Sequence, residues 1–245
     1  VMPSGTPVRR PKGQFRAPDG EVKYGPEPFQ DFELELGIFV GKGSQLGEPI
    51  LIEDAADHLF GYCLLNDWSA RAILAFEILP LGPFLGKSLM TSISTWIVTT
   101  EALAPFTAPA RSHANATMSH QHLMSKSDQL NGGYNINMYA DISTEKMRIN
   151  GEVPHNMTST NFTFSYWTPA QMLTHHASNG CALESGDLFG SGTVSGVERC
   201  SWATYAEICE KGDKTVQVGT ETRNFLDDRD EVIFRACAEK EDFIS

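Results

Sequence analysis

The stretch from Phe32 to Val40 constrains the fold of this chain more than any other segment. In F-E-L-E-L-G-I-F-V, apolar side chains occupy every second position, and Glu33, Glu35 and Gly37 lie between them. Successive side chains of a β-strand point to opposite faces, so this alternation predicts a strand with one apolar face against a core. We therefore expect a half-buried strand in a protein rich in β-structure.

The remaining patterns favour a mainly β fold with a few short helices. Further strands are expected at residues 62–65, 134–142, 186–196, 202–208 and 231–236. Helices are expected at residues 52–60, 71–76 and 168–176. Residues 1–28 and 105–133, the second with His113, His120 and His122, are expected to be loops. A length of 245 residues is compatible with one large domain.

Glu33 and Glu35 form a candidate metal site. Two positions apart on a strand, they leave the same face about 7 Å apart. Two ionised carboxylates this close raise each other's pKa unless a cation lies between them, and oxygen ligands favour Mg²⁺ or Ca²⁺. Taken alone, however, E-L-E is more typical of the solvent-exposed face of an amphipathic strand.

Asp67 and Lys87 could extend this site. Asp67 follows the apolar run 62–65 and would add a third carboxylate, or it could cap the helix that follows. Lys87 ends a loop rich in Pro and Gly, where it could bridge a metal-bound anion or be an exposed charge. Gly82 and Gly86 are separated by three residues, whereas a phosphate-binding loop needs four, which argues against nucleotide binding.

Two other motifs are less informative. His175 and His176 are adjacent on an expected helix, where neighbouring side chains point about 100° apart, so both cannot face one metal ion. We expect one of them to be a capping or core residue. The segment S-G-T-V-S-G at 191–196 lacks the spacing of a serine-hydrolase elbow and predicts a binding turn.

Charge and cysteine content limit the class of protein. A net charge of -12 disfavours nucleic acid and anionic membranes as partners. Five cysteines without C-x-x-C spacing argue against a disulfide framework and a zinc ribbon. The sequence contains no run of 18 apolar residues and no signal-peptide pattern. We expect a cytoplasmic protein.

Seven blocks, in this order, resemble the fumarylacetoacetase family. They are S-G-T-P-V-R-R-P at 4–11, E-L-E-L at 33–36, N-D-W-S-A-R at 66–71, G-P-F-L-G-K-S at 82–88, T-H-H at 174–176, N-G-C at 179–181 and S-G-T-V-S-G at 191–196. The resemblance spans nearly the whole chain. It implies a mixed β-roll, a homodimer, and hydrolysis of a C–C bond in a β-diketo acid. The implied substrate is 4-fumarylacetoacetate, cleaved to fumarate and acetoacetate in the last step of tyrosine and phenylalanine catabolism.

The resemblance also implies roles for individual residues. The implied ligands of Mg²⁺ or Ca²⁺ are Glu33, Glu35 and Asp67, with Lys87 and Thr91 beside them or near a second ion. The implied catalytic residues are Arg71, Lys87 and Glu207, and the implied substrate contacts are Thr193, Leu74 and Ile78. The cation would polarise the diketone, while Glu207 would orient a histidine that activates water.

The chain departs from the family pattern in three respects. The family's catalytic histidine, a fourth metal carboxylate (an aspartate) and an aromatic substrate contact precede the S-G-T-P block and would fall before Val1. Leu74 and Ile78 replace polar substrate contacts, and the end after Cys237 differs from the family's Gly-rich segment.

Three explanations are open. The chain could be part of a complete enzyme, a hydrolase of another acylpyruvate-like substrate, or a non-catalytic ligand-binding or assembly homologue. We expect the first: a single catalytic domain over residues 1–245 that lacks the family's N-terminal part and its usual C-terminal end.

Overall fold

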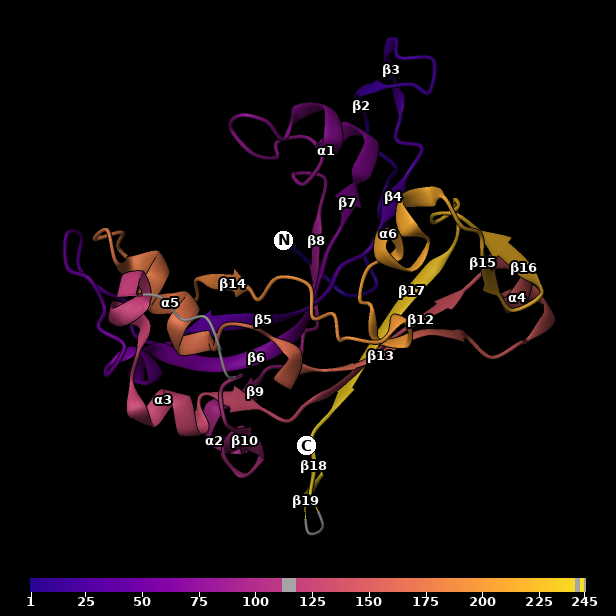
Figure 1. Cartoon of the computed structure of the whole chain (residues 1–245). Helices are drawn as coiled ribbons and strands as arrows, with labels where there is room; N and C mark the ends of the chain where they lie inside the picture. Colours follow the sequence, from indigo (N-terminus) through magenta and orange to yellow (C-terminus); the bar gives the residue numbers. More distant parts are fainter. Residues whose placement is uncertain (112–117, 241–242, 245) are drawn as a thin grey trace.

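The computed structural model describes residues 1–111, 118–240 and 243–244, and it confirms a mixed, β-rich fold with short helices (Figure 1). The α-helices are α1 (Arg71–Glu77), α2 (Thr100–Leu103), α3 (Lys126–Asn131), α4 (Glu145–Asn150), α5 (Pro169–Ala177) and α6 (Tyr205–Ile208). Shorter 3-10 helices cover Ala55–His58, Ala104–Phe106, Met118–Leu123, Phe162–Phe164, Arg199–Ser201 and Glu210–Gly212.

The central sheet has the strand order β1-β8-β6-β5-β14, with β9 also paired to β6. Its strands are β1 (Met2–Pro3), β5 (Leu34–Val40), β6 (Leu59–Asp67), β8 (Thr91–Ile93), β9 (Val98–Thr99) and β14 (Leu188–Gly190). Strand β5 is antiparallel to both of its neighbours, β6 and β14. The predicted strand is therefore present, but the expectation that it is half-buried is wrong, because the side chains on both of its faces are buried apart from a half-buried Phe39.

A second sheet has the order β13-β12-β17 and lies beside the central sheet (Figure 1). It is built from β12 (Asn137–Ser143), β13 (His155–Asn161) and β17 (Glu231–Cys237). One hydrophobic cluster contains Leu34 and Leu36 of β5 together with Met138 and Ile142 of β12. The apolar face of β5 thus packs against the second sheet, which leaves its opposite face for the acidic side chains.

The remaining strands form two-stranded pairs. These are β2 (Lys12–Arg16) with β3 (Val22–Pro26), β4 (Gln30–Asp31) with β7 (Ser69–Ala70), β10 (Thr107–Ala108) with β11 (Gly133–Tyr134), β15 (Val216–Val218) with β16 (Glu221–Arg223), and β18 (Glu239–Lys240) with β19 (Phe243–Ile244).

Helix α5 confirms the helix that was expected at residues 168–176. Thr168 accepts a hydrogen bond from the Gln171 backbone, and the Gln171 side chain accepts one from Thr168, which forms a capping box. Leu173 on the inner side of α5 packs in a second apolar cluster with Val40. His175 and His176 are both exposed. Neither of them is therefore a core residue, and that part of the expectation is wrong.

Several other expectations need correction. Residues 1–28 are not a loop, since β2 and β3 form a hairpin with a turn at Pro18, Asp19 and Gly20, a sequence that favours turns. Residues 105–133 contain α3, β10 and a 3-10 helix, because Phe106 and Leu123 are buried anchors. His113 lies outside the described residues.

Three smaller differences concern element type and length. Residues 205–208 are helical rather than extended, because Thr204 caps a helical turn by accepting a hydrogen bond from the Glu207 backbone. The helix expected at 52–60 is limited to the 3-10 turn Ala55–His58, and the strand expected at 186–196 is limited to β14. None of the helices in the described ranges is long and apolar enough to cross a membrane.

Candidate metal centre

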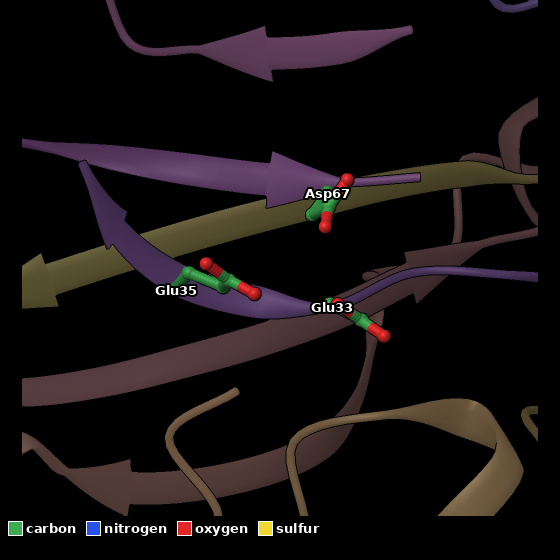
Figure 2. A group of neighbouring side chains, drawn as sticks. All are labelled: Glu33, Glu35 and Asp67. Carbon is green, nitrogen blue, oxygen red and sulfur yellow. The ribbon is translucent and has the colours of Figure 1, made fainter. Parts of the chain in front are cut away.

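Glu33, Glu35 and Asp67 converge at the end of the β5–β6 pair. Leu34 is paired with Asn66 and Glu35 with Leu65, so Glu33 lies opposite Asp67 on the same face. The Asp67 N–H donates to the Glu33 carbonyl at 3.3 Å. One ligand oxygen from each of the three carboxylates lies within 4.8 Å of the other two (Figure 2). Strand register therefore assembles the site.

Burial of these carboxylates excludes the solvent-exposed strand face as an interpretation of E-L-E. Glu33 is 8% exposed and Glu35 is 4% exposed, whereas Asp67 is half-buried. In the described part of the chain, these three residues are the one group of three or more His, Cys, Asp or Glu side chains with the spacing of a metal site. Buried carboxylates need a compensating partner.

Lys87 supplies part of that compensation. Its Nζ donates to Glu33 Oε2 at 2.7 Å and to Asp67 Oδ2 at 2.8 Å. The loop can deliver Lys87 here because Gly86 lies against α1, where an added Cβ would come within 2.8 Å of the Leu74 backbone. The interpretation of Lys87 as an exposed loop charge is therefore wrong.

Arg71 supplies the second cation. As the first residue of α1, it donates to Glu33 Oε1 at 2.8 Å and to Asp31 Oδ2 at 2.7 Å.

Asp67 does not cap this helix, because the buried carboxylate of Glu27 accepts hydrogen bonds from the backbone N–H groups of Ala72 and Ile73, both at 3.0 Å. The Asp67 carboxylate is thus left for the metal centre.

The electrostatics of the three carboxylates differ. Burial, followed by the charges of Glu33 and Asp67, raises the pKa of Glu35 to about 8, against a hydrogen bond from the Gly192 N–H at 2.9 Å. Burial also acts to raise the pKa of Glu33, but the charges of Arg71 and Lys87 outweigh it and hold that pKa below its usual value. The pKa of Asp67 is raised by burial, which its contact with Lys87 opposes.

The charge balance fits a divalent cation. Four carboxylates, including Asp31, meet two cationic side chains, so two negative charges are uncompensated when all four carboxylates are ionised. A divalent cation would supply the missing charge and relieve the repulsion that raises the pKa of Glu35. The donors are all carboxylate oxygens, the ligand type preferred by Mg²⁺ and Ca²⁺. Glu33, Glu35 and Asp67 are the residues that could hold it.

The other predicted residues are connected to the three carboxylates through neighbouring residues. Thr91 on β8 is paired with Asp67, and Thr193 follows Gly192, whose N–H contacts Glu35. Leu74 lies three residues after Arg71 on α1, and Ile78 is the residue that follows the helix, with its N–H bonded to the Leu74 carbonyl. Leu74 is half-buried and Ile78 is 40% exposed.

Among the described residues, no hydrogen bond joins Glu207 to Glu33, Glu35 or Asp67. Glu207 Oε2 accepts hydrogen bonds from Ser195 Oγ at 2.6 Å and Thr204 Oγ1 at 3.1 Å, and the side chain is exposed. It is therefore linked to the 191–196 segment, which also contains Thr193.

Sequence reasoning missed three contributors to the site. Asp31 continues the alternation of Glu33 and Glu35 by one more step, D-F-E-L-E, and this pattern could have identified it. Asn66 Oδ1 accepts a hydrogen bond from the Glu33 N–H at 3.0 Å. Glu27 acts from a distant segment, and no local pattern marks it as the cap of α1.

One protein family matches nearly the whole chain. Residues 1–239 match the family model described as "Fumarylacetoacetate (FAA) hydrolase C-terminal". Fumarylacetoacetase of Oryza sativa subsp. japonica is 43% identical over 245 residues, covering 99% of this chain and 55% of the relative. Fumarylacetoacetase of Homo sapiens is 43% identical over 235 residues, covering 95% and 54%. The chain thus spans about half the length of these curated relatives.

Solved structures share the fold at low sequence identity. The fumarylacetoacetate hydrolase of Exiguobacterium antarcticum has a TM-score of 0.50 at 18% identity, covering 89% of this chain and 63% of that one. Yeast ynq8, a fumarylacetoacetate hydrolase family protein, has a TM-score of 0.50 at 16% identity, covering 85% and 62%. These similarities support the fold alone.

Proposed function

The chain belongs to the fumarylacetoacetate hydrolase family, and we propose that it carries the metal centre of an enzyme that hydrolyses a C–C bond in a β-diketo acid. The observation that carries this proposal is the convergence of three carboxylates, the buried Glu33 and Glu35 and the half-buried Asp67, with one oxygen of each within 4.8 Å of the other two. The proposed substrate is 4-fumarylacetoacetate, after the curated relatives named fumarylacetoacetase.

Each residue of the centre has a proposed task. Glu33, Glu35 and Asp67 hold Mg²⁺ or Ca²⁺. When bound there, the cation polarises the diketone oxygens and stabilises the negative charge that develops as the C–C bond breaks. Lys87 and Arg71 keep Glu33 ionised and place positive charge beside the position of an anionic substrate.

The segment 191–196 completes the proposed site from the other side. The backbone N–H of Gly192 donates to Glu35, and we propose that the adjacent Thr193 contacts the substrate. Ser195 and Thr204 hold the Glu207 carboxylate, which we propose orients the base that activates water. Thr91, paired with Asp67, is proposed to support that ligand from β8.

The sharpest test compares Glu35→Ala with the wild type, both in the intact protein, in metal titrations and in cleavage of 4-fumarylacetoacetate. The substitution removes one of three ligands, so we expect binding of Mg²⁺ and turnover to fall by at least about 100-fold. Excess chelator should have the same effect on the wild-type chain. Full turnover in chelator would contradict the proposed mechanism. Metal binding without any cleavage by the intact protein would favour a non-catalytic homologue.

The apolar face of α1 favours a second substrate of the same chemical class. Leu74 follows Arg71 on one face of the helix, Ile78 follows the helix, and neither side chain can donate hydrogen bonds to a polar acyl group. An acylpyruvate-like substrate with an apolar tail would suit such a wall. A comparison of kcat/KM for a fumaryl and an alkyl diketo acid distinguishes these two candidate substrates.

We also propose that residues 1–245 act as one catalytic domain and that the protein is a cytoplasmic homodimer, as the family resemblance implies. Light scattering coupled to size-exclusion chromatography measures the oligomeric state. A mass corresponding to a single 27.0 kDa chain at micromolar concentration would contradict the dimer.

A further inference from the structure

Asp31 is a fully buried carboxylate that the proposed mechanism does not use. It is the last residue of β4 and has no exposed surface. Its Oδ1 accepts hydrogen bonds from the N–H groups of Phe32 at 2.8 Å and Tyr205 at 2.7 Å. Its Oδ2 accepts from the Ala206 N–H at 3.1 Å and from Arg71 Nε at 2.7 Å. The two oxygens therefore receive four donors.

These donors come from three separate parts of the fold. Arg71 begins α1, and its other nitrogen holds the metal-site carboxylate Glu33 at 2.8 Å. Tyr205 and Ala206 form the first turn of α6, the helix that carries Glu207. Asp31 itself lies two residues before Glu33 on the chain that enters β5. One side chain thus joins the metal centre to the helix of Glu207.

We propose that Asp31 is a positioning residue, which holds Arg71 against Glu33 and holds the first turn of α6 in place. Its carboxylate binds Arg71 Nε, while a terminal nitrogen of the same guanidinium binds Glu33. Arg71 is thereby fixed in one orientation and shares its charge between two carboxylates. This inference rests on the proposed function only for its effect on metal binding, because the link to α6 exists without a metal ion.

Asp31→Asn is the informative variant because it keeps the shape of the side chain. An amide has one acceptor oxygen and one donor nitrogen, so at least one of the four donors must face another donor. Loss of charge-assisted hydrogen bonds should then release Arg71 and the first turn of α6. We expect Mg²⁺ affinity, measured by calorimetry with Mg²⁺ alone, to fall by about 10- to 100-fold.

Asp141→Asn provides a matched control. Asp141 is also a buried aspartate, 5% exposed, and it accepts hydrogen bonds from Arg235 Nε and Asn156 Nδ2, both at 2.8 Å. It lies on β12 in the second sheet, outside the metal centre. Both variants should lower the melting temperature, but Asp141→Asn should leave Mg²⁺ affinity within about twofold of the wild-type value.

A double-mutant cycle separates positioning from a simple loss of charge. If Asp31 acts through Arg71, Asp31→Asn should change Mg²⁺ affinity by less than about twofold in an Arg71→Gln background. An equal loss in both backgrounds would overturn the proposal, because it would show that Asp31 acts through its field alone.

Hydrogen exchange measured by NMR on the full chain tests the proposal without metal. In the wild-type chain, the Arg71 Nε–H and the Tyr205 and Ala206 amides should exchange slowly and with the same denaturant dependence, because one carboxylate holds all three. Asp31→Asn should speed the exchange of these protons by at least about tenfold, whereas Asp141→Asn should not. Independent, fast exchange of the Arg71 proton in the wild-type chain would overturn the proposal, even if Asp31→Asn failed to fold.

The two readouts keep this proposal distinct from the proposed function. A wild-type chain that bound no Mg²⁺ would contradict the metal centre, while the exchange of the three protons would still decide the role of Asp31. Reduced Mg²⁺ affinity together with unchanged proton exchange in Asp31→Asn would contradict the positioning role alone.

Discussion

Glu35 is the residue whose protonation should control metal binding. Because its pKa is about 8 in the metal-free protein, Glu35 is mostly neutral at pH 6 and mostly ionised at pH 9. A cation must displace that proton to bind the carboxylate, so affinity should increase as pH rises. Neighbouring Glu33 stays ionised throughout this range, because Arg71 and Lys87 outweigh the effect of burial on its pKa.

The first prediction is a pH-dependent affinity for Mg²⁺. Between pH 6 and pH 8 the affinity should rise by up to about tenfold per pH unit, and it should level off above pH 8. Calorimetry in buffers with different ionisation enthalpies should show release of about one proton at pH 6. An affinity that is constant from pH 6 to pH 9 would contradict a Glu35 ligand with a pKa of about 8.

Gly86 is a second residue with a specific requirement. An alanine there would bring its Cβ within 2.8 Å of backbone atoms of Leu74, which cannot move without shifting α1. Gly25 on β3 offers a comparison, because the nearest atom to an added Cβ would be in the Phe15 ring at 3.7 Å, an ordinary contact.

The second prediction is that Gly86→Ala displaces Lys87. We expect the free energy of unfolding in urea to fall by about 1 to 3 kcal/mol, because the core must accommodate an overpacked contact. Mg²⁺ affinity should change as well, since Lys87 contacts Glu33 and Asp67. Gly25→Ala should change neither quantity appreciably. Equal effects of the two substitutions would contradict the proposed fit of the loop.

At the scale of elements, α1 combines a metal-site cation with an apolar wall. Glu27 caps its N-terminus, Asp31 fixes Arg71 in its first turn, and Gly86 packs against its middle. The helix is only two turns long, so these contacts from other segments determine where it lies. The same contacts place Leu74 on the face that begins with Arg71, and Ile78 just after the helix.

The third prediction concerns the substrate preference of this face. Leu74→Gln would add a hydrogen-bond donor and acceptor and should raise kcat/KM for 4-fumarylacetoacetate relative to an alkyl diketo acid by about tenfold or more. The ratio of the two kcat/KM values is the measurement, because it does not depend on the fraction of active protein. An unchanged ratio would show that Leu74 does not face the substrate.

For β5, the strand itself was predicted correctly, whereas the prediction of its burial was wrong. Alternation predicts β5, and an apolar run predicts the buried part of β6. Whether an acidic face is solvated depends on what covers it. Here Arg71 of α1 and Lys87 contact Glu33, and Gly192 contacts Glu35, and all three come from residues that follow β6 in the chain.

At the scale of the whole molecule, a bound cation should stabilise the folded state. Of the three candidate ligands, Glu33 and Glu35 lie at the start of β5 and Asp67 at the end of β6, and unfolding would separate these segments, so the unfolded chain should bind the cation much less tightly. The fourth prediction is that Mg²⁺ at 100 times its Kd adds about 2.7 kcal/mol to the free energy of unfolding. For a chain of this size, this corresponds to a rise in Tm of about 5 to 10 °C.

Differential scanning calorimetry with Mg²⁺ and with chelator measures this rise. Glu35→Ala should show no comparable rise, which provides the control. A wild-type Tm that is the same in Mg²⁺ and in chelator would contradict a metal centre that depends on the fold.

The sequence by itself determined the β-rich class, the strand at Phe32–Val40, the helix at α5, and the three carboxylates with Lys87 and Arg71 as candidates. Alternation, capping and loop composition are local signals, and these features depend mostly on neighbours in the chain. The seven blocks that resemble the family occur in the family's order along the chain, and this order is information that the periodicity of apolar residues does not contain.

Only the tertiary structure decided which of the competing interpretations holds. Burial of Glu33 and Glu35, capping of α1 by Glu27, and the four donors that meet at Asp31 all join segments far apart in sequence. Such contacts depend on strand register and on packing between segments, and neither quantity is encoded in a local pattern. The candidate metal centre is therefore visible in the sequence as a set of residue types, whereas its charge balance follows from the fold.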